Sequence, residues 1–308
     1  MTYYHKAVMV REVVESLVWK KDGVYLDGTI GEGGHAKEIL NSLSPSGLLI
    51  GIERDNTVLE ATGLRLRETN KAFKLFHASY DVFDDVLKGI NISKLSGAFL
   101  DLGLSQRQIS IPERGFSYQS KGPLDMRYDF NDGETAAHLL NTETTKEITN
   151  ILKENGEVRG AGRLAEGIVN RRKKKLWGET DELVAFIEEQ VPKKYSNKVI
   201  RQVFQALRIQ VNNELEHLKA FLNKIIDFLE IGGRLVVLSY HSLEDRIVKE
   251  FGRRNSSSCL CPPEAIVCTC GASPSLRVIT KHVMLPMIEE IEENSAAHSA
   301  HLRVFERI

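Results

Sequence analysis

The chain has 308 residues, of which 42% are hydrophobic and 27% charged, so it can bury a sizeable core and leaves room for a second domain. Its formal net charge of −1 argues against a protein that holds nucleic acid by bulk electrostatic attraction alone. The sequence offers neither a secretion signal nor an apolar run near the ~18 residues that span a bilayer, so we expect a cytoplasmic protein without a membrane partner.

The first hundred residues alternate between short apolar strands and segments with helical spacing of apolar side chains. Such alternation predicts an α/β fold in which a doubly wound parallel sheet is covered by helices on both faces. We expect strands at 24–27, 48–52 and 97–100, and helices at 8–19, 36–43 and 57–68.

The pattern changes between residues 105 and 200, where helical segments occur without a convincing apolar strand. A long amphipathic helix at 204–228 and a buried strand at 232–238 then resume the α/β pattern. We therefore expect one large domain made of residues 1–104 and 201–308, interrupted by a helical insertion that recognises the substrate. The helices of the insertion are expected near 136–155, 163–175 and 182–190.

A glycine cluster, Asp27-Gly-Thr-Ile-Gly-Glu-Gly-Gly-His35, lies between a predicted strand and a predicted helix. At this place an open α/β sheet forms a ligand crevice, and glycines let a ligand approach the backbone closely. Glu53 ends the next strand 22 residues after Gly31, near the ~20 expected for an acid that binds ribose hydroxyls, and Asp101 would face the same crevice. The order G-x-x-G-x-G-G differs from the dinucleotide pattern and is closer to that of S-adenosylmethionine loops, while a purely structural turn is the alternative.

Several longer motifs follow one another along the chain. They are Asp27–His35, Asp101–Ser105 with Gln108, Arg114–Tyr118, Gly122–Arg127, Phe204–Ile209 with Val211 and Asn212, and His241–Val248. With these motifs the chain resembles, from His5 almost to its C-terminus, the MraW family of bacterial small-subunit rRNA cytosine-N4 methyltransferases. The resemblance implies a Rossmann-like methyltransferase sheet with an inserted small helical domain. It also implies S-adenosylmethionine-dependent N4-methylation of a cytidine of 16S rRNA, in the P-site region of the small ribosomal subunit.

The resemblance further implies a set of cofactor contacts. These residues are Gly33, Gly34, His35, Glu53, Tyr80, Asp101 and Gln108. The chain departs from the family pattern at Glu53, where Asp is usual, and at Tyr80 and Tyr240, where Phe is usual. Each of these changes can keep the local role.

Methyl transfer from a sulfonium is an in-line displacement, so alignment of the nucleophile is the main contribution of an enzyme. The cytosine amine is a poor nucleophile because its lone pair is delocalised into the ring, and an acceptor for its N–H would help it react. We assign that catalytic role to Asp101 or the adjoining backbone, with His241 as the second candidate. The alternatives are a carboxylate that caps a loop and a histidine that bonds only its neighbours.

The predicted insertion mixes cationic and aromatic side chains suited to phosphate contacts and base stacking against an unstacked target. The candidates for substrate binding are Arg114, Tyr118 and Arg127. Phe116 is expected to pack in the core, and the basic run Arg171–Lys175 is expected to be a solvated helix end. Because residues 105–198 contain 16 Lys and Arg against 15 Asp and Glu, a net of +1, we expect recognition of an assembled ribosomal subunit by shape.

All the cysteines of the chain fall in a loop at 256–273, in a C-x-C, six-residue, C-x-C arrangement. They are Cys259, Cys261, Cys268 and Cys270. In a reducing compartment such a cluster favours a tetrahedral structural zinc site. The spacer within each pair is shorter than the usual two or more residues, so disulfides or free thiols are the alternatives.

Two other functions are compatible with the sequence. One is an amine methyltransferase that acts on DNA or a small molecule, against which the insertion and the 122–127 motif argue. The other is a non-catalytic nucleotide-binding ribosome assembly factor, which the intact Asp27, Gly31 and Asp101 disfavour. The sequence leaves the oligomeric state open, with a homodimer as one option.

Overall fold

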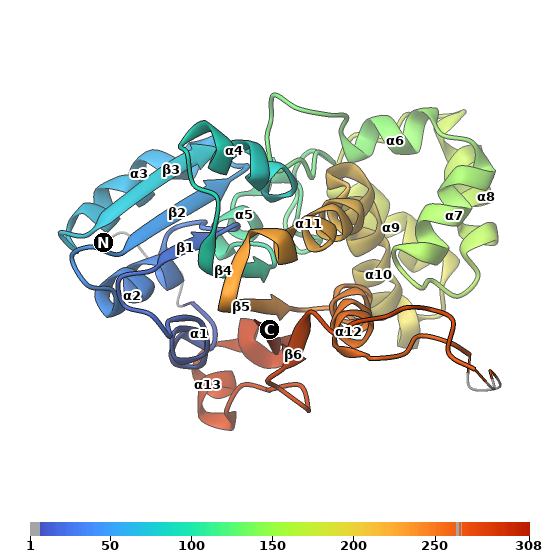
Figure 1. The fold of residues 1–308 in the computed structure, drawn as a ribbon. Helices are drawn as coiled ribbons and strands as arrows, with labels where there is room; N and C mark the ends of the chain where they lie inside the picture. Colours follow the sequence, from blue (N-terminus) through green and yellow to red (C-terminus); the bar gives the residue numbers. More distant parts are fainter. Residues whose placement is uncertain (1–6, 263–264, 266) are drawn as a thin grey trace. The chain divides into compact units, whose positions relative to one another are not determined.

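The chain folds into two compact units in the computed structural model, which describes residues 7–262, 265 and 267–308. One unit holds the chain up to Gly103 together with Glu216–Ile308 and carries the sheet, whereas Leu104–Leu215 forms a helical unit (Figure 1). The helical unit ends later than position 200, where we expected its boundary, because helix α10 (Lys193–Asn212) runs across that position. Among the described residues, none of the helices has the length and apolar character that crossing a membrane requires.

The sheet has seven strands in the order β3-β2-β1-β4-β5-β7-β6. The neighbours from β3 to β5 pair in parallel, but β7 pairs antiparallel with both β5 and β6. The expected parallel sheet is therefore a mixed one: helix α12 (Ser242–Ser256) leads from β5 to β6 two places away, and β7 fills the position between them. The strands are β1 (Val24–Asp27), β2 (Leu48–Glu53), β3 (Ala72–His77), β4 (Leu95–Leu102), β5 (Leu229–Ser239), β6 (Leu276–Val278) and β7 (His301–Arg307).

Helices cover both faces of the sheet, which confirms the doubly wound architecture. Successive strand residues point to opposite faces, so Tyr25 and Leu26 of β1 belong to two different apolar clusters. One cluster joins the sheet to α1, α2 and α3, and the other joins it to α4, α11 and α12. The helical elements of this unit besides α12 are α1 (Val10–Leu17), α2 (Gly34–Ser42), α3 (Asn56–Arg67), η1 (Tyr80–Val82), α4 (Phe83–Gly89), α11 (Glu214–Phe228), α13 (Ile288–Glu293) and η3 (Ser295–Ser299).

The helical unit has its own apolar core, which includes Leu152, Trp177 and Phe186. Its elements besides α10 are α5 (Gln106–Ser110), η2 (Pro112–Arg114), α6 (Ala136–Thr142), α7 (Thr145–Glu154), α8 (Ala161–Arg172) and α9 (Thr180–Gln190).

The single helix expected at 204–228 is two helices, because the chain turns at Asn213 between α10 and α11. Asn213 has φ 51°, in the left-handed region that asparagine adopts more readily than most residues. Its backbone N–H bonds back to the carbonyls of Gln210 and Ile209 and so closes the C-terminus of α10.

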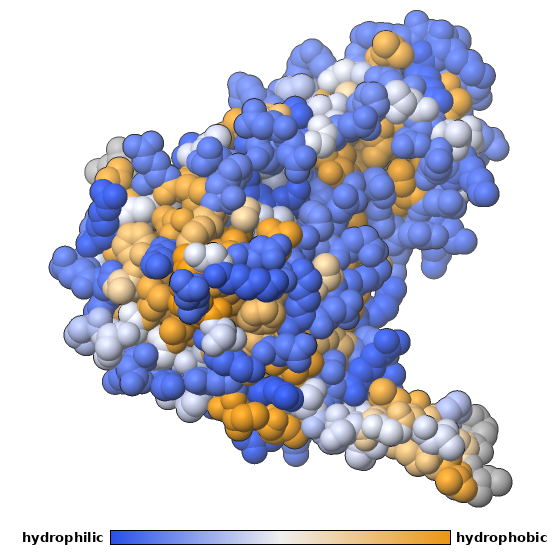
Figure 2. Space-filling view, turned by 45° about the horizontal axis from the view of Figure 1, so that its top comes forward, coloured by the Kyte–Doolittle hydropathy of each residue, from blue (hydrophilic) through white to orange (hydrophobic). Residues whose placement is uncertain are grey.

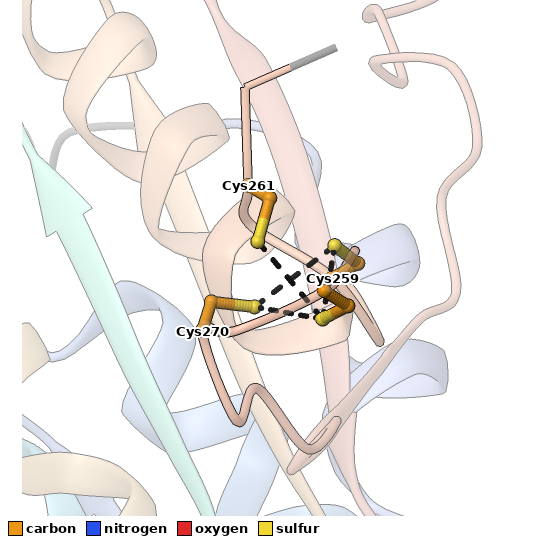
Figure 3. Close-up of side chains that lie close together, drawn as sticks. Cys259, Cys261 and Cys270 are labelled. Carbon is orange, nitrogen blue, oxygen red and sulfur yellow. Dashed lines mark hydrogen bonds between the residues drawn. The ribbon is translucent and has the colours of Figure 1, made fainter. Parts of the chain in front are cut away.

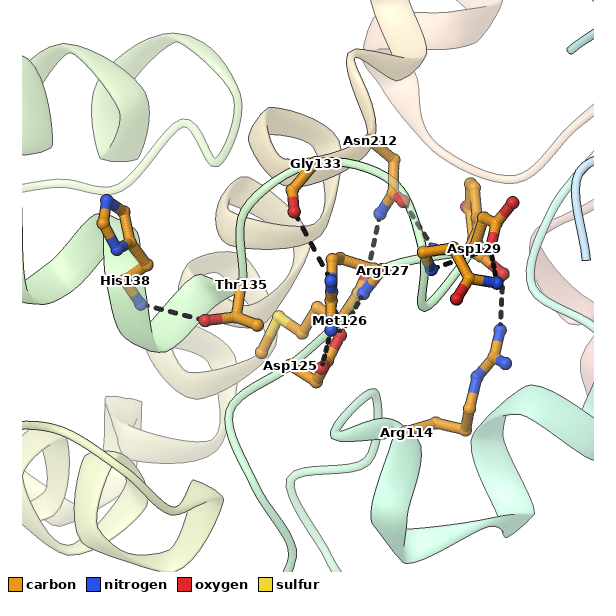
Figure 4. A network of polar contacts seen from close by, with 11 residues as sticks. Arg114, Asp125, Met126, Arg127, Asp129, Gly133, Thr135, His138 and Asn212 are labelled. Carbon is orange, nitrogen blue, oxygen red and sulfur yellow. Dashed lines mark hydrogen bonds and ion pairs between the residues drawn. The ribbon is translucent and has the colours of Figure 1, made fainter.

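Asn212, which is 2% exposed, ties two distant segments of the helical unit together. Its side-chain amide donates to the Met126 carbonyl at 2.7 Å and accepts the Tyr128 N–H at 2.8 Å (Figure 4). Met126 has φ 66°, a conformation that non-glycine residues rarely adopt. The buried amide thus holds the irregular segment around Met126 against α10, and two motifs far apart in sequence meet in space.

Replacing Asn212 by Ala is expected to destabilise the helical unit by about 1–3 kcal/mol, because the partnered backbone groups of Met126 and Tyr128 would lose their bonds. Urea unfolding followed by circular dichroism measures the loss. The matched control is Asn155→Ala, which removes only a solvent-accessible side-chain bond to Gln210. Equal effects of the two substitutions would contradict the role given to Asn212.

Candidate active site

Three acidic side chains gather where adjacent parallel strands end. Asp27 ends β1, Glu53 ends β2, and Asp101 lies one residue before the end of β4. Asp27 is 1% exposed. Its burial raises its pKa to about 8, and the charges of Asp101 and Glu53 act in the same direction. A ligand that brings positive charge to this edge of the sheet would offset the repulsion among the acids.

The loop after β1 has the backbone shape that its glycines permit. Gly31 has φ 49° and Gly33 has φ 76°, both in the left-handed region. Gly33 is the N-cap of α2, and Gly34 begins the helix so close to Ala7 that an added Cβ would lie 2.8 Å from the Ala7 Cβ. The structure thus gives these glycines a structural role, and the nearby acids are what favour a ligand-binding role for the loop, which stays a prediction.

Glu53 hydrogen-bonds the backbone of the loop after β1 and can still accept further hydrogen bonds. Its Oε2 accepts the Gly31 N–H at 2.9 Å and its Oε1 accepts the Asp55 N–H at 2.8 Å. Burial raises the pKa of Glu53 above its usual value, whereas these amide bonds lower it. Each carboxylate oxygen can accept two hydrogen bonds, so the arrangement suits an acid that also accepts from ligand hydroxyl groups.

Asp101 lies at the centre of a small polar network. Its Oδ1 accepts the O–H of Tyr240 at 2.7 Å, and its Oδ2 lies 3.5 Å from Nδ1 of His35. The backbone N–H of Asp101 donates to Thr29 Oγ1 at 2.7 Å. Because His35 Nε2 lies 2.7 Å from the Val8 carbonyl, which can only accept, Nε2 carries the proton. With 24% of its side chain exposed, Asp101 is held in place yet reachable by a ligand.

The contact between Tyr240 and Asp101 was missed by the sequence analysis, which treated Tyr240 only as a substitute for Phe. Burial, with the nearby charge of Asp101, raises the pKa of Tyr240 well above its usual value, so the phenol stays protonated and donates. The available signal was weak: each residue lies within two positions of the end of a predicted strand, and only the pairing of β4 with β5 brings the two together.

His241 follows Tyr240 as the N-cap of α12. Its Nδ1 accepts the Glu244 N–H at 3.4 Å, and its Nε2 lies 3.1 Å from Glu244 Oε1 without the alignment of a hydrogen bond. These contacts are with residues close in sequence, which fits the alternative of a histidine that bonds only its neighbours. The catalytic assignment of His241 stays a prediction.

Tyr80 and Gln108 lie in different units. Tyr80 borders the glycine loop, since a Cβ added to Gly28 would lie 3.1 Å from the Tyr80 Cβ, and its ring packs edge-on against Phe221. Gln108 belongs to the helical unit, where it forms a capping box with Ser105 at the start of α5. A cofactor contact by Gln108 therefore stays a prediction.

Arg114 and Arg127 organise the loop before α6 (Figure 4). Arg114 is 3% exposed, donates to the Tyr128 carbonyl at 2.8 Å, and lies over the Phe130 ring at 4.4 Å. Arg127 makes a bidentate pair with Asp125, with distances of 2.9 and 2.8 Å. These internal contacts give both arginines a structural role, and phosphate binding by them stays a prediction.

Tyr118, Phe116 and Arg171 of the helical unit also have internal partners. The Tyr118 hydroxyl accepts from Nε of Arg201 at 3.1 Å, and Phe116 lies in the core as expected. In the basic run, the Arg171 guanidinium lies 3.9 Å from the centre of the Trp177 ring. RNA contact by Tyr118 stays a prediction as well.

Replacing Asp27 by Asn is expected to change how stability depends on pH. Folding raises the pKa of Asp27 from 3.8 to about 8, so the native chain loses stability from this group as the pH rises through that window. The amide cannot ionise and still offers an oxygen to the Thr29 N–H. The unfolding free energy of Asp27→Asn minus that of the unchanged chain should therefore rise by at least ~1 kcal/mol when the pH is raised from about 4.5 to about 8.5.

Urea unfolding at the two pH values measures this gain, and Glu60→Gln serves as the control because Glu60 is an exposed carboxyl on α3. A stability difference between Asp27→Asn and the unchanged chain that does not vary with pH would show that Asp27 ionises normally.

Comparisons with known proteins show the family of the chain. Residues 2–308 match a family described as "MraW methylase family". A "Ribosomal RNA small subunit methyltransferase H" of Caldicellulosiruptor saccharolyticus is 44% identical, with 99% of this chain and 100% of the relative covered. Proteins of the same name from Halothermothrix orenii (41% identical; 99% and 98% covered) and Clostridioides difficile (39% identical; 100% of both) are also similar. The chain therefore belongs to the MraW methylase family.

Proposed function

We propose that this protein transfers a methyl group from S-adenosylmethionine to the exocyclic N4 amine of a cytidine in 16S rRNA, in the P-site region of the small ribosomal subunit. Membership of the methylase family and the names of the relatives support the reaction and the substrate class. The observation that carries the proposal is the partly exposed Asp101 carboxylate, which accepts a hydrogen bond from the Tyr240 hydroxyl beside the glycine loop. We expect the enzyme to act in the cytoplasm, on ribosomal particles.

The loop and its acids fit S-adenosylmethionine, which supplies an activated methyl group on a positively charged sulfur. Glu53 would accept hydrogen bonds from the ribose hydroxyls, in addition to those from Gly31 and Asp55. The backbone at Gly33 and Gly34 would lie against the ligand, with His35 and Tyr80 beside it. The charges of Asp101 and Glu53, which help to raise the pKa of Asp27, would be offset by the charge of the ligand.

Asp101 would accept the N–H of the cytosine amine and so favour the geometry in which the nitrogen lone pair can attack. The hydrogen bond from the Tyr240 hydroxyl fixes the orientation of the carboxylate, which is the positioning that an in-line displacement requires. After transfer the amine must lose a proton, and Asp101 is the acceptor within the site. His241 is the second candidate for this role.

The helical unit is proposed to recognise the RNA. Its near-neutral charge and the internal partners of Arg114 and Arg127 favour recognition of a shaped particle over attraction to a bare strand. The target base must be unstacked to reach Asp101.

Cells that lack this gene should lose one methyl group from one cytidine of the small-subunit rRNA, detected by mass spectrometry of rRNA fragments. Expression of the intact gene should restore the methyl group. Purified enzyme should methylate small subunits in preference to naked DNA or free cytidine. An rRNA methylation pattern that is the same with and without the gene would contradict the proposed substrate.

Asp101→Asn should lower the methyl-transfer rate by ~10²-fold or more, because the amide cannot take the proton. The matched variant is His241→Asn, since asparagine is a good N-cap residue and should preserve α12. If Asp101 is the acceptor, His241→Asn keeps a near-native rate. The opposite pattern would move the role to His241, and calorimetric titration with S-adenosylmethionine would separate binding from chemistry.

A further inference from the structure

The loop between α12 and β6 is long and has no apolar core of its own. The described residues of 257–275 contain no helix or strand, and its Leu260 and Val267 are 42% and 72% exposed. Figure 2 shows apolar side chains uncovered on the arm at the lower right. The base of the loop is closed where the Ser275 N–H donates to the Asn255 carbonyl at 2.8 Å. Because chain entropy opposes order in such a loop, its described residues need another interaction to hold them in one conformation.

The four cysteine sulfurs gather in this loop (Figure 3). All their Sγ atoms lie within 4.8 Å of one another. Cys268 Sγ lies 3.5 Å from that of Cys259, 3.9 Å from that of Cys261 and 3.6 Å from that of Cys270. The Cys259 and Cys270 sulfurs are 3.9 Å apart.

These distances match ligands that share one metal ion. A tetrahedral zinc ion with Zn–S bonds of about 2.3 Å places its sulfurs about 3.8 Å apart. A disulfide needs about 2.05 Å, and all four cysteines are free thiols. The geometry therefore favours a shared ion over the disulfide alternative.

Backbone amides support the sulfurs in a reciprocal pattern. The N–H of Leu260, between the first two cysteines, donates to Cys270 Sγ at 3.2 Å. The N–H of Thr269, between the last two, donates to Cys261 Sγ at 3.4 Å. Such donors stabilise the thiolate form, which is the form that binds metal. The backbone N–H of the single residue inside each C-x-C pair thus donates to a sulfur of the other pair. This exchange is a physical reason for the short spacer.

We propose that Cys259, Cys261, Cys268 and Cys270 together bind one zinc ion as a closed structural site that orders the 257–275 loop. Zn²⁺ suits four thiolates in tetrahedral geometry, and with four protein ligands it keeps no open position for catalysis. Binding forms four Zn–S bonds and releases the thiol protons to solvent, with no change of oxidation state. The proposal does not depend on the proposed methyl-transfer function.

Elemental analysis of the full-length protein, purified under reducing conditions and supplied with Zn²⁺, should give one zinc ion per chain. Thr269→Ala should also retain one ion, because its exposed side chain is replaced while its amide remains. The double variant Cys259→Ser with Cys270→Ser should retain none. Co²⁺ in place of Zn²⁺ should give the visible absorption of a tetrahedral thiolate complex in the unchanged chain and in Thr269→Ala, but not in the double cysteine variant. Zinc content near zero in the unchanged chain, or equal content in all three, would overturn the proposal.

Two readouts separate an ordered zinc site from adventitious binding. The chain has only four cysteines, so a thiol reagent reports on this site alone. Zinc should protect all four thiols, and a chelator should expose them again. Hydrogen exchange at the Leu260 and Thr269 amides should slow when Zn²⁺ is bound. Thiol reactivity and amide exchange that are the same with and without Zn²⁺ would overturn the structural role.

Discussion

The parallel register of β1 with β2 and β4 is the constraint on which the site depends. It pairs Asp27 with Gly51 on one side and with Phe99 on the other, so that the acids at the ends of the three strands lie at one edge. Removing carboxyl groups from water costs free energy unless they are hydrogen-bonded. The loop after β1 limits that cost, because the N–H groups of Thr29 and Gly31 donate to Asp27 and Glu53.

The site therefore combines unfavourable electrostatic repulsion among its acids with a geometry that hydrogen bonds fix. Burial and the charges of Asp101 and Glu53 favour protonation of Asp27, while the Asp101 carboxylate is held by the hydrogen bond from Tyr240. Fixed dipoles and charges that need no rearrangement when a ligand arrives are the means by which enzymes stabilise developing charge. A cationic cofactor would complete this arrangement and lower its electrostatic cost, which links the stability of the sheet edge to the reaction.

Away from the sheet, a few polar groups fix backbone that apolar packing cannot. Asn212 holds the irregular segment at Met126, and the reciprocal amide bonds of Leu260 and Thr269 join the two halves of the cysteine loop. In both places the polar partners come from segments separated in sequence. Such contacts specify one conformation where the hydrophobic effect, which has no direction, would allow several.

The sequence by itself determined the elements whose signals are local. Apolar runs and glycine spacing located β1, β2, β4 and the loop after β1, and the strand-end acids followed from the same pattern. The tertiary structure alone decided the antiparallel place of β7, the break at Asn213 and the bond from Tyr240 to Asp101, which joins residues 139 positions apart. It also made His241 a helix cap and buried Arg114. Local patterns report periodicity and turn chemistry, whereas strand order and the partners of a polar side chain depend on which distant segments pack together.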